Sequence, residues 1–122
     1  MALKYFLDTF AFFEIIHGNP KYKRYLTEPC CTSILNLYEL YYHLLKEEGK
    51  DFADNEFRRF LLLKIDIPNE IFPKAAAFRA QCNSQGISFI DALGYALARE
   101  NNLLFVTGDK EFKNVPHVEW VR

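Results

Sequence analysis

The organisation of this chain is set out by residues 4–18, whose sequence is K-Y-F-L-D-T-F-A-F-F-E-I-I-H-G. The apolar run Lys4–Leu7 has the length of a β-strand and stops at Asp8. Thr9–His17 then has the apolar spacing of a helix, which ends at Gly18 and the Asn-Pro pair that follows it. A strand followed at once by a helix indicates a β–α unit with an acid at the carboxyl end of its strand.

The same alternation of short apolar runs and helical stretches continues along the chain. Because strands separated by helices are parallel strands joined by crossovers, the pattern predicts a three-layer α/β domain. Two helices fall within residues 35–63, so one-to-one alternation fails there. We find no linker, repeat or low-complexity tract, which predicts a single domain over residues 1–122. Further strands are predicted at Cys31–Ile34, Lys64–Ile67, Leu103–Val106 and Val118–Val121, and further helices at Lys21–Thr27, Leu35–Glu48, Phe52–Leu63, Glu70–Gln85 and Ser88–Asn101.

Composition excludes several classes of protein. Half of the 122 residues are hydrophobic and 16% are aromatic, which excludes a disordered chain. No apolar run approaches the roughly 20 residues of a membrane-spanning helix, and a signal peptide is not expected in residues 1–8, which lack a basic start and reach an acid early. Three cysteines without a spaced framework favour free thiols and a cytoplasmic protein. The net charge of −1 excludes a nucleic-acid binder that works by bulk positive charge.

Four acids stand where parallel α/β sheets place their ligands. Asp8 directly follows the first predicted strand, and Asp109 follows the fourth. Ligands of such sheets bind outside the carboxyl ends of the strands, near the point where the strand order reverses. Glu39 and Asp91 lie near the starts of two helices, among apolar neighbours. An ionised carboxylate beside core residues is costly unless it is paired, hydrogen-bonded or bound to a metal.

Each acid also has a simpler structural explanation. Asn36 and Ser88 stand three residues before Glu39 and Asp91, which is the spacing of a helix N-cap followed by an acid in the first turn. The other two acids fit a helix cap and a turn. Capping and metal binding are compatible, because helix starts at the carboxyl edge of a sheet are where ligands lie. Four acids in such positions together favour a shared site.

The segments F-L-D-T, L-Y-E-L, F-I-D-A-L-G-Y-A-L-A and L-L-F-V-T-G-D-K-E-F follow one another along the chain. They resemble, in order and spacing, the four signature segments of PIN-domain ribonucleases, and most closely those of small stand-alone VapC-like toxins. The resemblance runs from Tyr5 to about Phe112. It implies an α/β/α fold with a central, mainly parallel five-stranded sheet and a helical hairpin between its second and third strands. The two helices in residues 35–63 match that hairpin.

The resemblance also implies the site residues. It makes Asp8, Glu39 and Asp91 the three core acids, Asp109 the fourth and Thr107 a matching hydroxyl. The implied cofactor is Mg²⁺ or Mn²⁺, the implied substrate is RNA, and the implied activity is that of an endoribonuclease. These hard cations prefer oxygen ligands, lower the pKa of bound water and polarise phosphoryl oxygens. The residues alone indicate metal-dependent phosphodiester chemistry.

Two positions depart from the family pattern, and both lie near the predicted site. Gly108 stands where such toxins often carry a basic residue, and Phe10 stands where a small polar residue is common. With the four acids set aside as ligands, the remaining charge of the chain is mildly positive. The basic residues that we considered for phosphate contact are Lys21, Lys23, Arg24, Lys110 and Lys113.

The aromatic excess predicts a partner surface as well as a core. It exceeds what one small core usually absorbs, which favours a homodimer face or a site for a partner helix. The resemblance implies both kinds of partner: a second copy in a homodimer, and the antitoxin protein of a toxin–antitoxin pair. No membrane partner is expected. The apolar residues in question are Phe10, Phe12, Phe13 and Ile16, with Tyr38, Tyr41, Tyr42 and Leu45.

Two alternatives remain open from the sequence. The first is a phospho-receiver signalling domain, for which Asp66 near a predicted strand, Thr107 and Lys110 fit superficially. It leaves Glu39 and Asp91 unexplained. The second is a catalytically inactive PIN-like binding module. A zinc site is not expected, because the three histidines are isolated and interpreted as surface or helix-end residues.

Overall fold

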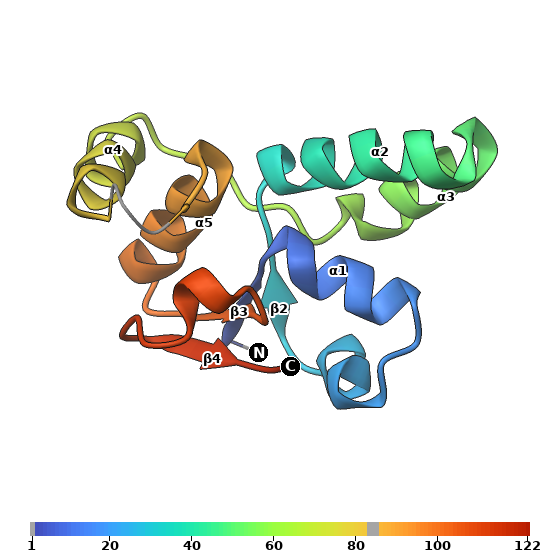
Figure 1. Ribbon diagram of the computed structural model, residues 1–122, viewed down its shortest axis with the longest axis horizontal. Coiled ribbons are helices and arrows are strands. Elements are labelled where there is room, and N and C mark those ends of the chain that lie inside the picture. Colours follow the sequence, from blue (N-terminus) through green and yellow to red (C-terminus); the bar gives the residue numbers. More distant parts are fainter. Residues whose placement is uncertain (1, 83–85) are drawn as a thin grey trace.

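A parallel β-sheet forms the centre of the chain. The computed structural model describes residues 2–82 and 86–122. Within them the sheet has four parallel strands in the order β2-β1-β3-β4 (Figure 1). The strands are β1 (Tyr5–Leu7), β2 (Cys30–Cys31), β3 (Leu104–Thr107) and β4 (Val118–Trp120). The predicted α/β class and parallel pairing are therefore confirmed.

The fifth strand of the prediction is reduced to one residue pair. Lys64 forms an isolated parallel bridge with Thr32, beyond the β2 edge of the sheet. Two backbone bonds frame it, from Thr32 N to Leu63 O at 3.0 Å and from Ile65 N to Thr32 O at 2.9 Å. The pairing stays short because Ser33 already caps the next helix, which also ends β2 earlier than predicted. A short edge strand exposes few unpaired backbone groups.

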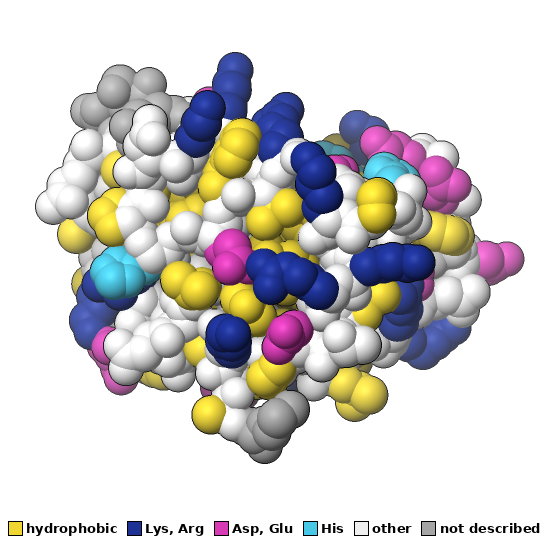
Figure 2. All heavy atoms as spheres, turned by 90° about the horizontal axis from the view of Figure 1, so that it is seen from below, with side chains coloured by type: hydrophobic (Ala, Val, Ile, Leu, Met, Phe, Trp, Pro, Cys, Tyr) yellow, Lys and Arg dark blue, Asp and Glu magenta, His cyan; other side chains and the backbone are white. Residues whose placement is uncertain are grey.

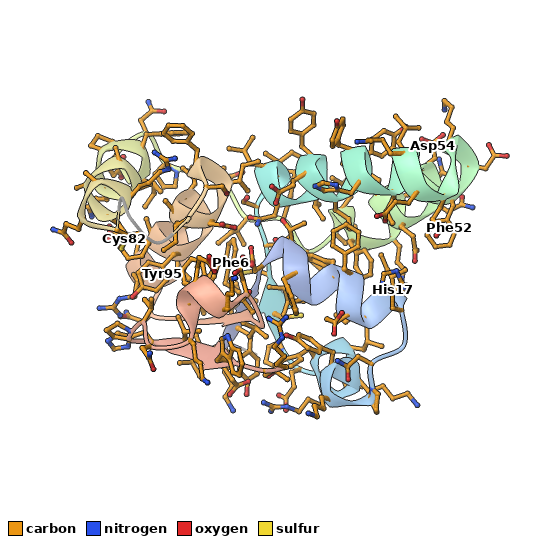
Figure 3. All side chains as sticks on the ribbon, viewed as in Figure 1. Phe6, His17, Phe52, Asp54, Cys82 and Tyr95 are labelled. Atoms are coloured by element: carbon orange, nitrogen blue, oxygen red, sulfur yellow. The ribbon has the colours of Figure 1, made fainter. Side chains whose placement is uncertain are left out.

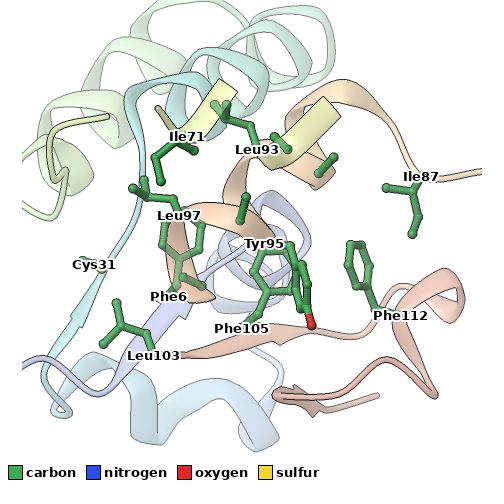
Figure 4. Close-up of a cluster of buried hydrophobic side chains, with 14 residues drawn as sticks. Phe6, Cys31, Ile71, Ile87, Leu93, Tyr95, Leu97, Leu103, Phe105 and Phe112 are labelled. Atoms are coloured by element: carbon green, nitrogen blue, oxygen red, sulfur yellow. The ribbon is translucent and has the colours of Figure 1, made fainter. Parts of the chain in front are cut away.

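Helices cover both faces of this sheet. Successive strand residues point to opposite faces, so Phe6 and Phe105 enter one core cluster while Tyr5 and Val106 enter the other. Figure 4 shows the first cluster, in which Phe105 stacks on Phe6 and also meets Tyr95 of α5 and Phe112 of η2. The helices are α1 (Thr9–Ile16), α2 (Ile34–Glu48), α3 (Lys50–Leu61), α4 (Ile71–Gln81) and α5 (Phe89–Glu100), with 3-10 helices η1 (Pro20–Leu26) and η2 (Lys110–Phe112).

The second and third helices form the expected hairpin. Helices α2 and α3 pack side by side (Figure 1), joined at Gly49, whose φ of +92° suits glycine. Asp54 of α3 accepts hydrogen bonds from the Tyr41 hydroxyl at 2.7 Å and from the Lys50 ammonium at 2.6 Å. Figure 3 places Phe52 and Asp54 near the tip of this hairpin, away from the sheet. The predicted two-helix insertion is confirmed.

The remaining differences from the predicted elements are small. The predicted helix Lys21–Thr27 is the 3-10 helix η1, and α4 ends at Gln81. The end of the predicted helix Glu70–Gln85 lies outside the described residues. No helix within residues 2–82 and 86–122 is both long and apolar enough to cross a membrane.

The aromatic excess is divided between core and surface. Phe12 is fully buried, and four of the apolar residues named for a partner surface are half-buried, namely Phe10, Phe13, Ile16 and Tyr41. Three residues of α2 remain exposed, with exposed fractions of 65% for Tyr38, 51% for Tyr42 and 41% for Leu45. Of the apolar residues named for a partner surface, the exposed ones therefore all lie on α2.

Gly108 lies where the chain leaves β3, under tight steric limits. A Cβ atom at this position would lie 2.3 Å from the Val121 carbonyl oxygen and 2.5 Å from Cε1 of Phe10. Val121 directly follows β4, and its backbone amide donates to the Thr107 carbonyl oxygen at 2.9 Å. This close approach therefore holds the chain after β4 against the end of β3.

We expect Gly108→Ala to lower the free energy of unfolding by about 2–3 kcal/mol, because the added methyl group must displace backbone. Urea denaturation monitored by circular dichroism measures this. Gly94→Ala is the matched control, since a Cβ there would meet side chains first, with Phe6 Cε1 at 3.0 Å. Gly94→Ala should lower the free energy of unfolding by less than Gly108→Ala does. A Gly108→Ala variant as stable as the wild type would contradict this account of the close approach.

Candidate active site

The sheet creates a crevice between β1 and β3. The chain leaves β1 towards β2 on one side, while β3 pairs with β1 on its other side. The strand order therefore reverses at this pair, which is where open α/β sheets bind ligands. Asp8 follows β1 directly, Thr107 is the last residue of β3, and Asp109 stands two residues beyond it. Two of the predicted acids and the predicted hydroxyl thus meet at the carboxyl edge of adjacent strands.

A pocket of about 290 Å³ lies at this edge, and all four predicted acids line it. Asp8 and Asp109 come from the strand ends, Glu39 from α2 and Asp91 from α5. The other lining residues are Thr9, Phe10, Phe13, His43 and Ser88. Four residues spread over most of the chain are therefore brought together by the fold.

Asp8 is the most deeply buried of the four acids, with an exposed fraction of 2%. It occupies the N-cap position of α1, yet its side chain makes no capping hydrogen bond. Its carboxylate instead accepts from Thr107 Oγ1 at 2.8 Å and, more distantly, from Asn36 Nδ2 at 3.5 Å. Burial raises the pKa of Asp8 well above its ordinary value, the charge of Asp91 raises it further, and the hydrogen bond from Thr107 opposes the rise. The capping explanation therefore fails for Asp8.

Asp91 caps its helix, as the sequence predicts. Its Oδ2 accepts from the Ser88 amide at 3.0 Å, and its own amide donates to Ser88 Oγ at 3.1 Å, which completes a capping box. Burial raises the pKa of Asp91 to about 6 in spite of these bonds, and the charges of Glu39 and Asp109 add to the effect. Capping thus fixes the position of Asp91 without neutralising its charge.

Asp109 and Glu39 are held differently. Asp109 Oδ1 accepts from the Glu111 amide at 3.1 Å and so caps η2, while its own amide donates to Thr107 Oγ1 at 3.1 Å. The predicted turn or cap role of Asp109 is therefore confirmed. Glu39 is half-buried and lies one turn beyond the start of α2. The N-cap of that helix is Ser33, so the capping explanation of Glu39 through Asn36 is wrong.

Asn36 is a site residue that the sequence interpretation assigned to capping. It is fully buried, and its Nδ2 donates to Thr9 Oγ1 at 3.2 Å as well as to Asp8. Its Oδ1 accepts from Ser33 Oγ at 2.7 Å, which orients the amide. The only signal in the sequence is a polar residue on an otherwise apolar helix face, one turn before Glu39. That spacing fits a cap equally well.

His43 is a second residue that sequence reasoning missed. It lies one turn after Glu39 on the same face of α2 and lines the pocket beside Phe13. The sequence interpretation treated it as a surface or helix-end histidine. The spacing of four residues places His43 on the same helix face as Glu39. This predicts a site residue only when that face of α2 is known to border the pocket.

The basic residues considered for phosphate contact do not line this pocket. Arg24 pairs with Glu119 at 2.5 Å, and the Lys21 ammonium donates to the Arg122 carbonyl at 2.6 Å. Lys110 borders a separate hollow beside Glu111. In Figure 2, on the face seen from below the view of Figure 1, lysine and arginine side chains are interspersed with apolar and acidic ones. Any positive charge at the pocket must therefore come from elsewhere.

The donor set suits a hard divalent cation. Within the described residues, no group of three histidine, cysteine or acidic side chains converges in ligand geometry. Mg²⁺ does not require such a group, since it usually binds through one or two carboxylates and retains several waters. Four carboxylates without a cation are expected to stay apart, because like charges repel. Asp8, Glu39, Asp91 and Asp109 all supply oxygen, the ligand that Mg²⁺ and Mn²⁺ prefer.

The raised pKa of Asp91 has a measurable effect on stability. Between its ordinary pKa of 3.8 and about 6, the folded chain binds more protons than the unfolded chain. The free energy of unfolding therefore falls as the pH rises through this range and then levels off. We expect Asp91→Asn to remove this loss, since its amide oxygen still accepts from the Ser88 amide.

In metal-free buffer the Asp91→Asn variant should be more stable than the wild type by about 2 kcal/mol at neutral pH and nearly equal to it near pH 4. Urea denaturation across this pH range checks the difference. Asp66→Asn, at an exposed carboxylate outside the pocket, is the control and should leave the pH profile unchanged. Parallel profiles for Asp91→Asn and the wild type would show that Asp91 is not destabilised in the folded chain.

Comparison with known proteins identifies the family. The PIN domain family model matches residues 5–118. VapC20 of Mycobacterium tuberculosis, described as a sarcin–ricin loop cleaving toxin, superposes with a TM-score of 0.80 at 22% identity, covering 98% of this chain and 99% of that one. VapBC2 of Rickettsia felis, bound to a DNA fragment from its promoter, gives 0.74 at 25% identity, with 95% and 96% covered.

A toxin–antitoxin complex from Klebsiella pneumoniae gives a TM-score of 0.74 at 21% identity, with 94% of this chain and 95% of that one covered. No curated protein matches the sequence. These likenesses show a shared fold, and the family match spans almost the whole chain. The parallel sheet and the helical hairpin agree with that match, and the chain belongs to the PIN-domain family.

Proposed function

We propose that this chain is a metal-dependent endoribonuclease, with residues 1–122 acting as a single nuclease domain. PIN domains are typically nucleases, and the nucleases of the family generally use divalent metals. One observation carries the proposal. Four carboxylates from separate elements border one pocket at the reversal point of the sheet, and the most buried of them, Asp8, is not used for capping.

In the proposed mechanism Asp8, Glu39, Asp91 and Asp109 hold Mg²⁺ or Mn²⁺. A divalent ion lowers the pKa of bound water and polarises the phosphoryl oxygen of a phosphodiester. The chain itself supplies the positioning. Thr107 and Asn36 hold the Asp8 carboxylate by their hydrogen bonds, and the capping box holds Asp91. Buried like charges also raise the affinity of the pocket for a cation, because binding relieves their repulsion.

We also propose that the chain is the toxin of a toxin–antitoxin pair and works in the cytoplasm. The similar structures include a toxin–antitoxin complex and a toxin described as cleaving the sarcin–ricin loop, which supports this class of function.

An apolar groove of about 720 Å³ lies on the α2–α3 hairpin, lined by Ile34, Leu35, Tyr38, Tyr41, Asp54 and Phe57. We propose this surface for a protein partner, either an antitoxin or a second copy in a homodimer. Light scattering over a range of concentrations tests the dimer.

The structure argues against one of the two alternatives that the sequence left open, the phospho-receiver domain. A phospho-receiver needs Asp66 beside the other acids, but Asp66 is exposed and does not line their pocket. The family match also favours the nuclease. A catalytically inactive PIN-like module remains the second candidate, and it requires acids that bind no metal or bind one without cleavage.

The decisive experiment is RNA cleavage with Mg²⁺ or Mn²⁺, followed by gel electrophoresis. We expect cleavage by the wild type, none with excess EDTA, and at least about 100-fold slower cleavage by Asp8→Asn and Glu39→Gln, which each remove a ligand charge. Asp66→Asn should cleave at the wild-type rate. Equal cleavage by the wild type and Asp8→Asn would refute the role proposed for Asp8. Loss of cleavage in Asp66→Asn alone would refute the proposed acid site.

A further inference from the structure

The acid pocket has an aromatic wall beside its carboxylates. We use this name for Phe10 and Phe13 of α1 and His43 of α2, all of which line the pocket. The Phe13 and His43 rings meet at 5.7 Å between centroids, with an angle of 67° between their planes. Each of the three side chains is half-buried, so each keeps part of its surface open to the pocket. Carboxylates and aromatic surface therefore share one small cavity.

Packing of the core explains only part of this wall. On α1, Phe12 is fully buried in the core cluster on that face of the sheet. Phe10 and Phe13, two residues before Phe12 and one after it, pack against the edge of the same cluster and also line the pocket. Phe10 is held from behind, by Tyr22 with ring centroids 6.4 Å apart and by the close approach of Gly108. The rings are thus fixed by their neighbours while part of their surface remains unused.

Flat apolar surface beside a phosphodiester site suits a nucleobase. Every base has a π-face, and stacking on an aromatic side chain contributes binding free energy without depending on which base it is. The wall is made of aromatic rings and contains no carboxylate, so it can accept a base next to carboxylates that repel the RNA backbone. The carboxylates in the same pocket, Asp8, Glu39 and Asp91, would face the phosphate through a cation.

We propose that the aromatic wall is a base-stacking subsite, in which one nucleobase stacks on one ring of the Phe13–His43 pair and meets the other at its edge, with Phe10 in support, next to the phosphodiester at the acids. The ligand class is an RNA strand with an unpaired base at this position, because a base within a duplex does not offer a free face. The identity of the ligand rests on the ribonuclease function proposed above. These residues contact substrate and position it, while the acids carry the chemistry.

The test measures binding to a phosphorothioate-linked, single-stranded RNA octamer by fluorescence anisotropy. A series of octamers carries an abasic residue at each position in turn. For the wild type we expect one position at which loss of the base weakens binding about tenfold, the size of a single stacking contact. Phe13→Leu and His43→Leu should bind the intact octamer about tenfold more weakly, and in these variants the abasic penalty at that position should nearly vanish.

Phe52→Leu is the matched control, since Phe52 is 37% exposed near the tip of the α2–α3 hairpin and does not line the pocket. Phe52→Leu should bind the intact octamer with wild-type affinity and should show the same weakening at the abasic position as the wild type. Thermal melts and Mn²⁺ titration by calorimetry show that the variants remain folded with an intact acid pocket. A loss of affinity that leaves the abasic penalty at full size would overturn the stacking role, as would wild-type affinity in both wall variants.

The same measurements separate the two proposals. A wild type that binds no Mn²⁺ and cleaves no RNA, yet shows the base penalty, would refute the nuclease and support the subsite. A wild type that cleaves RNA with Mn²⁺ but shows no penalty at any position would support the nuclease and refute the subsite.

Discussion

A carboxylate buried at the end of β1 is the constraint on which the rest of this structure depends. Asp8 loses almost all of its contact with water and lies near other acids. The hydrogen bonds that offset this cost come from Thr107 and Asn36, which belong to β3 and α2. These bonds form only if β3 pairs directly with β1 and if α2 begins above both strands. The strand order and the site are therefore one arrangement, and a change to either alters the other.

The two departures from the family pattern lie next to each other in the structure. A Cβ atom at Gly108 would lie 2.5 Å from Phe10 Cε1, so the ring of Phe10 fills the space that a side chain at 108 would need. The Val121 carbonyl oxygen, 2.3 Å from the same Cβ, also leaves no room for a side chain at position 108. The guanidinium of Arg122 lies over the same ring at 5.8 Å and donates to the Gly108 carbonyl at 2.7 Å. A cation thus lies beside position 108 even though glycine occupies it.

The sequence predicts those features that depend on neighbours along the chain. The strand that ends at Asp8 and the capping box at Ser88 and Asp91 are both local patterns, and both occur as expected. The failures depend on contacts between distant segments. Lys64 pairs with only one residue because the edge of β2 is short, and Asn36 serves Asp8 instead of its own helix. No spacing within α2 distinguishes a cap from a partner located 28 positions earlier in the chain.

The grouping of acids and rings bears on how a nearly neutral chain can act on a polyanion. The basic residues considered for phosphate contact are paired or do not line the pocket. Under the proposed function, attraction to phosphate at the site comes from bound cations instead of side chains. Stacking releases no counterions, so it adds affinity that salt weakens little. An acidic pocket with an aromatic wall therefore needs less positive surface than a groove that tracks the backbone, and a net charge of −1 is compatible with binding RNA at one place.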